Sequence, residues 1–403
     1  MAEKVILFEE KKDCSGCGAC GNACPKGAIF MREDEYGYSY PVIEDDLCIK
    51  CGTCKKICGL RNHTNMIEPL KVYALATRDE EAIKKSASGG AFEVMARYVL
   101  QRGGVVVGVQ LEEEEDSLAP KHCIITDMDD LYKLQGSKYV QSNTGEIYKK
   151  VLEYAASQRM VLFSGTPCQN ASLRNMLKDN YANVILVDII CHGVPNGRMF
   201  KDFIRYRQRR LKAKVKKFYF RDKHYGQGYT TRTVYERDGI CKEKICKGEL
   251  FAYIRFFSKS LTLRESCYNC SFATRKRVSD ITIGDYWGFN EEFKDTDKKG
   301  LNDELGVSCF LVNSKKGEAF LKELDDNVVK IESSYDMVLK HNKQLNAPTK
   351  MPQERELILE AYKNNGYVEL ERLYWTKWFG DKIKYIISSG ISKNKRIIKN
   401  MFT

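Results

Sequence analysis

Two cysteine runs within the first sixty residues constrain this chain more than any other feature. Residues 14–24 have the spacing C-x2-C-x2-C-x3-C, and residues 48–58 repeat it. Two residues between cysteines let one tight loop aim three thiolates at one cube of iron and sulfide, while the fourth thiolate binds the neighbouring cube. The pattern therefore predicts a module with two 4Fe-4S clusters, which exchange single electrons.

This crossed rule assigns the eight cysteines to two clusters. One cluster takes Cys14, Cys17, Cys20 and Cys58, and the other takes Cys48, Cys51, Cys54 and Cys24. Zinc and disulfides are the alternatives, but zinc prefers C-x2-C pairs with longer spacers and disulfides belong to secreted chains. The pattern departs from its usual form at Gly59, where a proline commonly follows the last cysteine.

Composition bounds the remainder of the chain. The 403 residues leave room for two or three domains, and sixteen cysteines without an apolar leader predict reduced thiols and a cytoplasmic protein. The net charge is +12, yet residues 1–70 hold more acidic than basic side chains, so the positive excess lies downstream. A basic body favours anionic ligands or acidic partners. Nucleic acid is not expected, since no nucleic-acid-binding motif accompanies the charge.

Helices and strands alternate from about residue 71. Apolar stretches at 71–77, 105–110, 160–165 and 183–190 predict strands, and amphipathic stretches at 89–103, 145–158 and 169–179 predict helices. Such an order predicts an α/β domain whose sheet is covered on both faces. Ligands bind such sheets beyond the carboxyl ends of the strands.

Two polar segments fall at those positions. Residues 86–90 (SASGG) enter a predicted helix, where backbone N–H groups can bind a phosphate, although a plain helix cap explains them equally well. Residues 135–142 (QGSKYVQS) combine glycine, cation, aromatic ring and amide, and a solvated turn is the alternative there.

Four further cysteines suggest a third cluster. Cys168 and Cys191 each follow a predicted parallel strand, so neighbouring strands bring both thiols to one edge of the sheet, and Cys267 and Cys270 add a C-x2-C pair. Four thiols are the number that a 4Fe-4S cluster needs. The alternative is that Cys168 and Cys191 are buried apolar residues and that the pair binds zinc or nothing.

Several motifs in fixed order resemble one known family. SASGGAF, QGSKYVQS, SGTPCQNASL, DIICHGVP, FYFRDKHYGQGY and SCYNCSFATRKRVSDITIGDYWGF follow the two-cluster module. Together they resemble the beta subunits of coenzyme F420 hydrogenases and dehydrogenases, over most of the chain to about residue 350. The resemblance implies an FAD-binding α/β domain with a cluster close to the flavin.

Carried onto matching positions, the resemblance makes Cys168, Cys191, Cys267 and Cys270 the ligands of that cluster. The implied flavin contacts are Ser86, Ser88, Gly89, Gly90, Gly136, Ser137, Lys138, Tyr139, Gln141, Thr166 and Gln169. The substrate stays open, because FRDKHYGQGY departs from the form common in bacterial relatives and is expected near the substrate pocket. Coenzyme F420 is one candidate, and another small organic hydride donor or acceptor is the alternative.

These parts predict an iron-sulfur flavoprotein oxidoreductase. FAD exchanges a hydride with an organic partner, and the clusters pass single electrons to a protein carrier such as a ferredoxin or a partner subunit. The rival function is a noncatalytic electron-transfer subunit of a larger redox complex. A radical S-adenosylmethionine enzyme lacks its C-x3-C-x2-C triad. His192, beside Cys191, is a candidate proton-transfer group, although a structural role is more common for a lone histidine.

The predicted fold is multidomain, α+β and α/β, with three parts. Residues 1–68 form the two-cluster, ferredoxin-like domain. Residues 69–350 form the α/β FAD-binding catalytic domain with the third cluster and a mixed, β-rich later part, and 351–403 form a basic helical extension. In the middle part, Asp285 follows a glycine on a β-rich stretch, where capping a turn is favoured over binding a ribose. In the extension, residues 372–399 interleave aromatic and basic side chains, which allows peripheral contact with a membrane, although packing on the body is more common.

Overall fold

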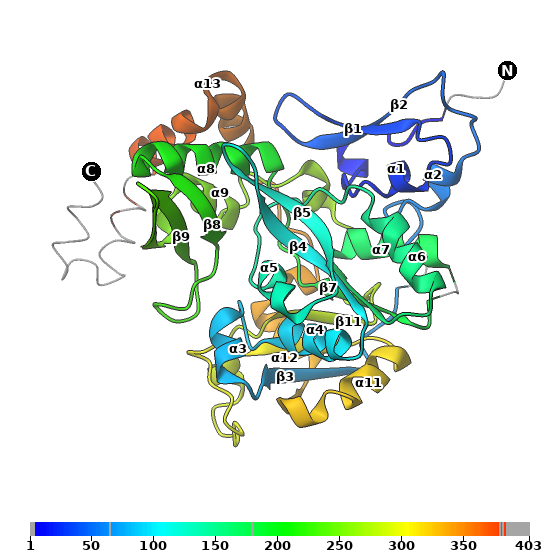
Figure 1. The fold of residues 1–403 in the computed structure, drawn as a ribbon. Coiled ribbons are helices and arrows are strands. Elements are labelled where there is room, and N and C mark those ends of the chain that lie inside the picture. The colour runs from blue at the N-terminus through cyan, green and yellow to red at the C-terminus, as the bar shows by residue number, and fades with distance from the viewer. Residues whose placement is uncertain (1–4, 64–65, 179–180, 379, 381–382, 384–403) are drawn as a thin grey trace.

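The structure of the protein is a computed structural model that describes residues 5–63, 66–178, 181–378, 380 and 383. The N-terminal module combines a hairpin with two short helices that carry cysteines (Figure 1). Its elements are the 3-10 helix Lys11–Asp13, α1 (Ala19–Ala23), β1 (Ile29–Glu33), β2 (Ser39–Ile43) and α2 (Thr53–Lys56). Gly18 and Gly52 precede the two helices with φ of 76° and 72°, a left-handed conformation that favours glycine. The repeated C-x2-C spacing thus produces two similar turns, each leading into a helix.

The body of the molecule is built on an eight-stranded mixed sheet in the order β13-β3-β12-β11-β7-β6-β4-β5. The strands are β3 (Lys71–Thr77), β4 (Val105–Glu113), β5 (Leu118–Ile125), β6 (Val161–Gly165), β7 (Val184–Ile189), β11 (Ile281–Asp285), β12 (Ser308–Val312) and β13 (Val328–Ser333). The four central strands β11, β7, β6 and β4 are parallel, whereas β5, β12 and β13 pair antiparallel with their neighbours.

The strands and helices expected between residues 71 and 190 are confirmed. The helices are α4 (Ala91–Gln101), α6 (Ile147–Ala156) and α7 (Pro167–Leu177), and they alternate with β3, β4, β6 and β7. The sequence prediction missed β5, which contains Pro120 and turns back from β4 as an edge strand, where a residue without an N–H group is tolerated. The predicted alternation of strands and helices therefore holds for the parallel centre of the sheet. The edges of the sheet are antiparallel.

Alternate side chains of each central strand face opposite layers of helices, as the two-residue period of a strand requires. On one face, Val106 and Leu162 pack with α4 and with α11 (Lys315–Lys322). On the other face, Val107 and Phe163 pack with α6 and α7. Smaller helices cover the rest: α3 (Glu80–Lys85), α5 (Leu131–Leu134), α10 (Phe289–Glu292) and α12 (Tyr335–His341). Both faces of the sheet are thus buried, and a ligand reaches it at the ends of the strands.

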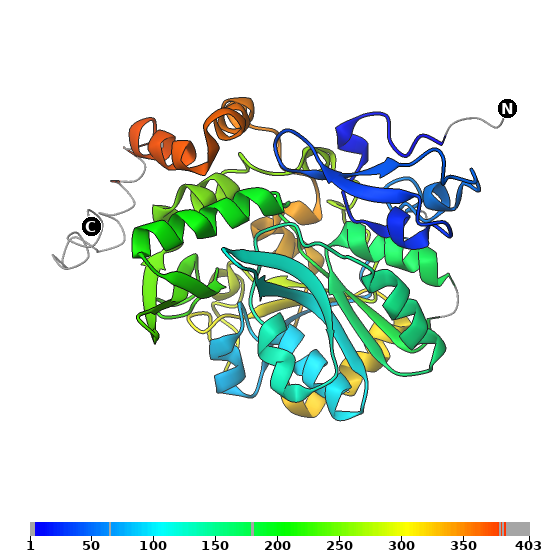
Figure 2. The same cartoon turned by 45° about the horizontal axis from the view of Figure 1, so that its top comes forward.

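A second core, rich in aromatic rings, lies beside the sheet. It contains α8 (Gly197–Leu211), the antiparallel strands β8 (Lys214–Tyr219), β9 (Thr230–Arg237) and β10 (Ile240–Lys247), α9 (Ala252–Ser258) and α13 (Arg355–Thr376). Phe203 stacks on Tyr253 with ring centroids 5.1 Å apart. Figures 1 and 2 show α13 running beside α8.

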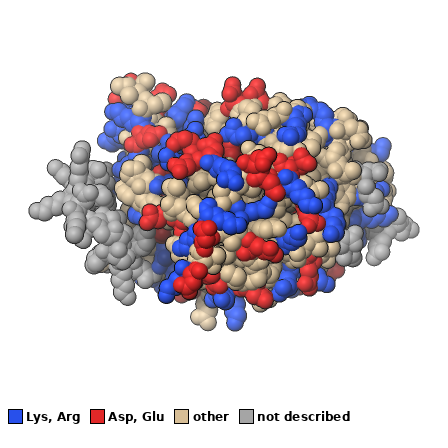
Figure 3. Space-filling model, turned by 90° about the horizontal axis from the view of Figure 1, so that it is seen from below, with Lys and Arg blue, Asp and Glu red and all other residues tan. Residues whose placement is uncertain are grey.

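The described part of the C-terminal segment packs on the body. Tyr367, Leu370 and Tyr374 of α13 are buried in the second core, and the Tyr367 hydroxyl accepts a hydrogen bond from the Tyr253 N–H at 3.1 Å. Most of the basic aromatic stretch 372–399, including Phe379, Ile386 and Ile387, lies outside the described residues. Among the described helices, none is long and apolar enough to cross a membrane. On the face shown in Figure 3, lysines and arginines are mixed with acidic side chains, and neither charge dominates.

The N-terminal module lies directly against the body, next to α6 and α7 (Figures 1 and 2). Tyr38 and Tyr40 of its hairpin are buried in the second core, and the Tyr38 hydroxyl donates to the Thr262 carbonyl at 2.9 Å. The Asn22 side chain donates to the Gly145 carbonyl at 2.6 Å. Because these contacts are buried and polar groups are satisfied across them, the module is held in one orientation.

Candidate cofactor sites

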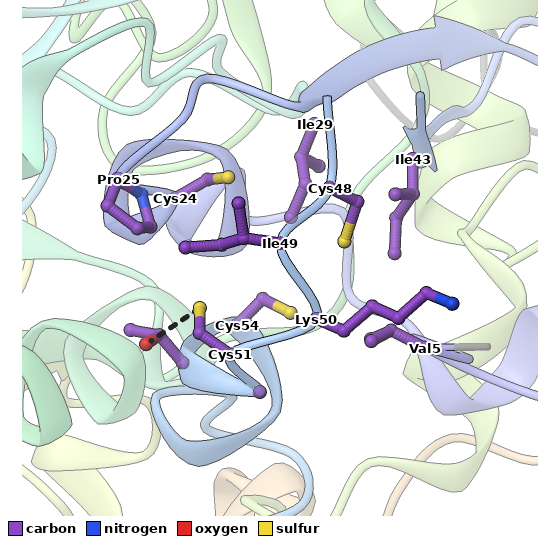
Figure 4. A pocket seen from close by; sticks show the side chains of 12 residues that line it. Val5, Cys24, Pro25, Ile29, Ile43, Cys48, Ile49, Lys50, Cys51 and Cys54 are labelled. Atoms are coloured by element: carbon purple, nitrogen blue, oxygen red, sulfur yellow. Dashed lines mark hydrogen bonds between the residues drawn. The ribbon is translucent and has the colours of Figure 1, made fainter. Parts of the chain in front are cut away.

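Four cysteines of the module surround a small pocket of about 20 Å³ near its surface (Figure 4). Cys48 and Cys51 come from one loop, Cys54 comes from α2 directly after it, and Cys24 comes from the end of α1. Ile29, Ile43 and Ile49 complete an apolar wall around the thiols. This is the combination of three thiols from one run and the fourth from the other that crossed ligation predicts. Cys51 is exposed, and its thiol lies 3.3 Å from the Thr53 hydroxyl, which lowers its pKa.

The other four cysteines of the module face the body, where Cys17 lies 3.4 Å from the Ser172 hydroxyl of α7 and Cys14 packs against the second core. Burial raises the pKa of the Cys14 thiol to about 11, and charge on Cys17 and Cys58 acts in the same direction, as expected for thiols that lie near one another. The same holds for Cys20, whose pKa burial raises well above its usual value. Cys17, Cys58 and Cys20 therefore gather around Cys14, as the sequence assignment expects.

Gly59 is the residue that departs from the usual proline, and the structure gives the reason. Its N–H group donates to the Ser172 hydroxyl of α7 at 3.0 Å. A Cβ atom at Gly59 would lie 2.7 Å from the Ala171 Cβ, closer than such atoms approach. A proline would lose the hydrogen bond and collide with α7, so the close approach of the module to the body explains the glycine.

The third group of cysteines comes from three separate parts of the chain. Cys168 lies at the start of α7 after β6, and Cys191 follows β7, the parallel neighbour of β6. Cys267 and Cys270 belong to the 3-10 turn Glu265–Asn269 and its end. Burial raises the pKa of Cys168 to about 12, and charge on Cys267 and Cys270 acts in the same direction. The parallel pairing of β6 and β7 thus brings the first two thiols together, and the 3-10 turn brings the other pair to them.

The three groups suit iron-sulfur clusters by their chemistry. Each offers four thiols, most of them at least partly sheltered from water. Without a metal, burial disfavours the thiolate form of Cys14, Cys168 and Cys191. Within the described part of the chain, no group of three or more His, Cys, Asp or Glu side chains converges closely enough for one metal ion. The thiols of a cubane bind four different irons, so they need not converge on one point.

One cavity of about 500 Å³ extends from the third cysteine group along the ends of the central strands. Its size is that of a cofactor site. Ten of the eleven residues expected to contact a flavin line it, namely Ser86, Ser88, Gly90, Gly136, Ser137, Lys138, Tyr139, Gln141, Thr166 and Gln169. Gly89 does not line it: a Cβ there would lie 2.5 Å from the Leu75 carbonyl oxygen, so this glycine serves the close packing of α4 on β3.

Several of these side chains already have partners within the protein. The Lys138 ammonium donates to the carbonyls of Lys133, Leu134 and Gln135 at 2.8–3.2 Å, and burial lowers its pKa to about 7. The Ser88 hydroxyl donates to the Val307 carbonyl at 2.7 Å. Gln169 caps α7 by accepting from the Thr166 N–H at 2.9 Å. These side chains stabilise the conformation of the loops. The loops therefore offer mainly backbone groups to a ligand.

Sequence reasoning named Asp285 but not its partner Arg221, and the two together form a charged end of the cavity. Arg221, which is buried, pairs with Asp285 at 2.9 Å and donates to the Tyr139 hydroxyl at 3.1 Å. The guanidinium also lies 5.4 Å from the ring of Trp287, and Gln227 donates to Asp285 at 2.7 Å. The Asp285 carboxylate thus holds this cluster at the cavity wall, in place of the turn cap that its sequence position favours. Arg221 is the arginine of the FRDK motif. Because that motif is expected near the substrate pocket, it could have indicated Arg221 as a residue of the site.

His192 lines the cavity, and both of its ring nitrogens are engaged. Gln344 lies 2.9 Å from Nδ1, and the Ser260 hydroxyl lies 2.9 Å from Nε2. Burial lowers the pKa of the ring and so favours its neutral form. These contacts favour the structural role over proton transfer.

The fold and the cysteine groups together define a two-cluster ferredoxin module joined to a mixed α/β oxidoreductase body. Residues 72–149 and 158–336 match the N-terminal and C-terminal regions of the "Coenzyme F420 hydrogenase/dehydrogenase, beta subunit" models, and residues 13–60 match the "4Fe-4S dicluster domain". The chain belongs to the family of coenzyme F420 hydrogenase/dehydrogenase beta subunits.

Individual relatives are distant. One subunit of the F(420)H(2) dehydrogenase of Methanosarcina mazei is 21% identical over 208 residues, a match that covers 47% of this chain and 56% of that subunit. An uncharacterised ferredoxin of Methanocaldococcus jannaschii is 39% identical over 87 residues, which cover 21% of this chain and 100% of the ferredoxin. A chain of the F420-reducing [NiFe] hydrogenase complex from Methanosarcina barkeri aligns with a TM-score of 0.44 and 15% identity, covering 73% of this chain and 93% of that one.

Proposed function

We propose that the protein is an FAD-dependent iron-sulfur oxidoreductase that passes electrons between a hydride-exchanging organic partner and a one-electron protein carrier. The observation that carries the proposal is the continuity of one cavity: the residues expected at the flavin share its wall with Cys168, Cys191, Cys267 and Cys270. Cys17 of the N-terminal module also reaches this wall. A flavin bound here would supply conversion between hydride transfer and single-electron transfer.

The protein's own groups suit the cavity to a dinucleotide. The loops 86–90 and 135–142 border it, and the first residues of α4, Ala91 to Glu93, line it without a side-chain cap on the helix. Free N–H groups at the start of an eleven-residue helix attract a phosphate. The part of the cavity at Arg221 and Asp285 differs in chemistry, since it offers charge and the partly exposed ring of Trp287. We assign this end to the organic partner, for which coenzyme F420 is one candidate.

The three cysteine groups lie in an order that suits a relay. The third group borders the cavity. Charge on Cys17 contributes to the raised pKa of Cys168, so the group of Cys14, Cys17, Cys20 and Cys58 comes next. The group of Cys24, Cys48, Cys51 and Cys54 comes last, near the surface. Ile49 at this last site is 57% exposed, and Ile6 and Leu47 are also exposed. An apolar surface beside an exposed cluster ligand is where we expect the protein carrier to contact the module.

The domain boundaries follow from the same assignment. We assign residues 1–68 to the two cluster sites of the module and 69–350 to the FAD-binding body with the third site. The described part of 351–403 adds α13 to the second core. Peripheral contact of the remaining tail with a membrane stays a prediction.

The test is anaerobic reconstitution of the full chain with iron, sulfide and FAD, followed by flavin bleaching with reduced F420, NADH, NADPH and reduced ferredoxin in separate assays. We expect one equivalent of bound FAD, bleaching by one of the three hydride donors, and electron exchange of the flavin with ferredoxin through the clusters. Iron and sulfide bound without FAD would contradict the proposal and indicate the noncatalytic electron-transfer subunit. The hydride donor that bleaches the flavin would also name the substrate class.

A further inference from the structure

The side chain of Arg264 joins two of the three cysteine groups. It is fully buried, and its Nε atom donates to the Cys14 carbonyl at 2.9 Å. Its backbone carbonyl accepts from the Cys267 N–H at 2.9 Å. The guanidinium approaches the module so closely that a Cβ at Gly16 would lie 2.7 Å from it. Arg264 therefore contacts the Cys14 loop with its side chain and the Cys267 turn with its backbone.

The other partners of this guanidinium are uncharged. Nη1 donates to the Gln141 side-chain oxygen at 3.0 Å and Nη2 to the Ser39 carbonyl at 2.7 Å, while the Tyr40 ring lies 4.1 Å away. Among the residues that the structure describes, no carboxylate forms an ion pair with Arg264. A buried charge without an opposite charge is costly, because the interior solvates it poorly.

Two of the three other buried arginines pair with a carboxylate, whereas Arg207 packs on the Phe251 ring and bonds the Thr233 hydroxyl. Arg277 pairs with Asp188 at 3.0 Å, and Arg221 pairs with Asp285 at 2.9 Å. Arg264 is instead bonded to the backbone of one cysteine in each of two groups, to the Cys14 carbonyl through Nε and to the Cys267 N–H through its own carbonyl. Its charge therefore lies beside both groups. Thiolates of iron-sulfur clusters would provide the missing negative charge on either side of the guanidinium.

We propose that Arg264 is a positioning residue that balances the charge of two clusters at once and raises the reduction potential of both. The proposal rests on the proposed function, since it needs clusters at the Cys14, Cys17, Cys20, Cys58 group and at the Cys168, Cys191, Cys267, Cys270 group. Addition of one electron makes either cluster more negative by one charge, and a fixed cation nearby favours that reduced state. Arg264 does not line the pocket of Cys24, Cys48, Cys51 and Cys54, so the potential there serves as an internal reference.

The experiment is a redox titration of the reconstituted full chain, followed by electron paramagnetic resonance, for wild type, Arg264→Gln and Arg264→Lys. We expect Arg264→Gln to make reduction of two clusters about tenfold less favourable, which is about 59 mV lower for a one-electron couple. The reference cluster near the surface keeps its potential. Arg264→Lys keeps the charge and restores most of the shift, which a purely structural role would not predict. The control is Arg207→Gln, which removes a buried arginine that packs on Phe251 and leaves all three potentials unchanged.

A second variant covers the case in which Arg264→Gln fails to assemble. Gln141→Glu keeps the arginine and the shape of its partner, and next to the guanidinium the new carboxyl ionises and cancels the charge locally. The same two potentials then fall. Clusters that load normally but keep wild-type potentials in both variants would overturn the proposal. Wild-type protein without the third cluster would instead overturn the proposed function, and iron analysis separates the two results.

Discussion

The Cys17 Sγ atom lies 3.4 Å from the Ser172 hydroxyl, across the junction of the N-terminal module and α7. The same hydroxyl accepts the Gly59 N–H. Since α7 begins beside Cys168, one helix supports both the inner cysteine group of the module and the third group in the body. The distance between these two groups thus depends on how closely the module docks on α7.

Replacement of Gly59 tests this docking. Gly59→Ala places a methyl group against Ala171 and Ser172, so we expect a loss of about 1–3 kcal/mol of stability at this contact. Gly59→Pro also loses the hydrogen bond to Ser172 and is expected to be worse. Limited proteolysis between the module and the body measures the effect. The double variant Gly59→Ala with Ser172→Gly relieves part of the clash and should recover part of the protease resistance. Equal protease resistance of wild type and Gly59→Pro would refute this account.

The buried ion pair between Asp188 and Arg277 supports the carboxyl end of β7. Both side chains are at most 2% exposed, so Asp188→Ala leaves the Arg277 charge buried without a partner. We expect a loss of about 3–5 kcal/mol in the free energy of unfolding, measured by urea denaturation. The control is Lys84→Ala, which breaks an exposed pair with Glu81 and is expected to cost less than about 1 kcal/mol. Similar losses in both variants would contradict the prediction.

Iron content tests the ligand assignment. The wild type is expected to hold about twelve irons per chain, four for each cubane. Cys168→Ala removes one ligand of the third group, and we expect about eight irons with the two clusters of the module retained. Cys241→Ala is the matched control, because this thiol is exposed on β10 and belongs to none of the three groups. Twelve irons in the Cys168 variant would exclude that thiol as a ligand.

The buried ring of His122 makes stability depend on pH. Burial lowers its pKa in the folded state to about 4, while the unfolded chain keeps a value near 6.5. Between these values the unfolded state binds more protons, so the stability contributed by the neutral ring is complete above about pH 6.5 and is lost as the pH falls towards 4. Urea denaturation from pH 7 to pH 4 should show this loss, with an upper limit of about 3 kcal/mol.

The variant that checks it is His122→Gln, whose side chain does not titrate. It should be less stable than wild type at pH 7, because the ring packs on Phe163 and contacts the Ser142 hydroxyl at 2.9 Å. Its stability should nevertheless fall less steeply with acid. Parallel curves for variant and wild type would assign the acid sensitivity to other groups.

Local spacing determined much of this protein from sequence alone. The repeated cysteine runs were enough to predict that Cys24 lies beside the second run and Cys58 beside the first, because ligand spacing within a loop is a local property. Apolar periodicity was likewise enough to find β3, β4, β6 and β7 and the longer helices α4, α6 and α7. Both signals come from residues close together in the chain.

Only the tertiary structure decided what lies between these parts. Cys168 and Cys191 meet the Cys267 pair because β6 and β7 are parallel neighbours and a distant turn folds over their ends. Arg264 lies more than a hundred residues from Gln141 and still farther from Cys14, so no local pattern marked it as their shared partner. Contacts between distant segments depend on how whole helices and strands pack. A pattern of neighbouring residues does not predict that packing.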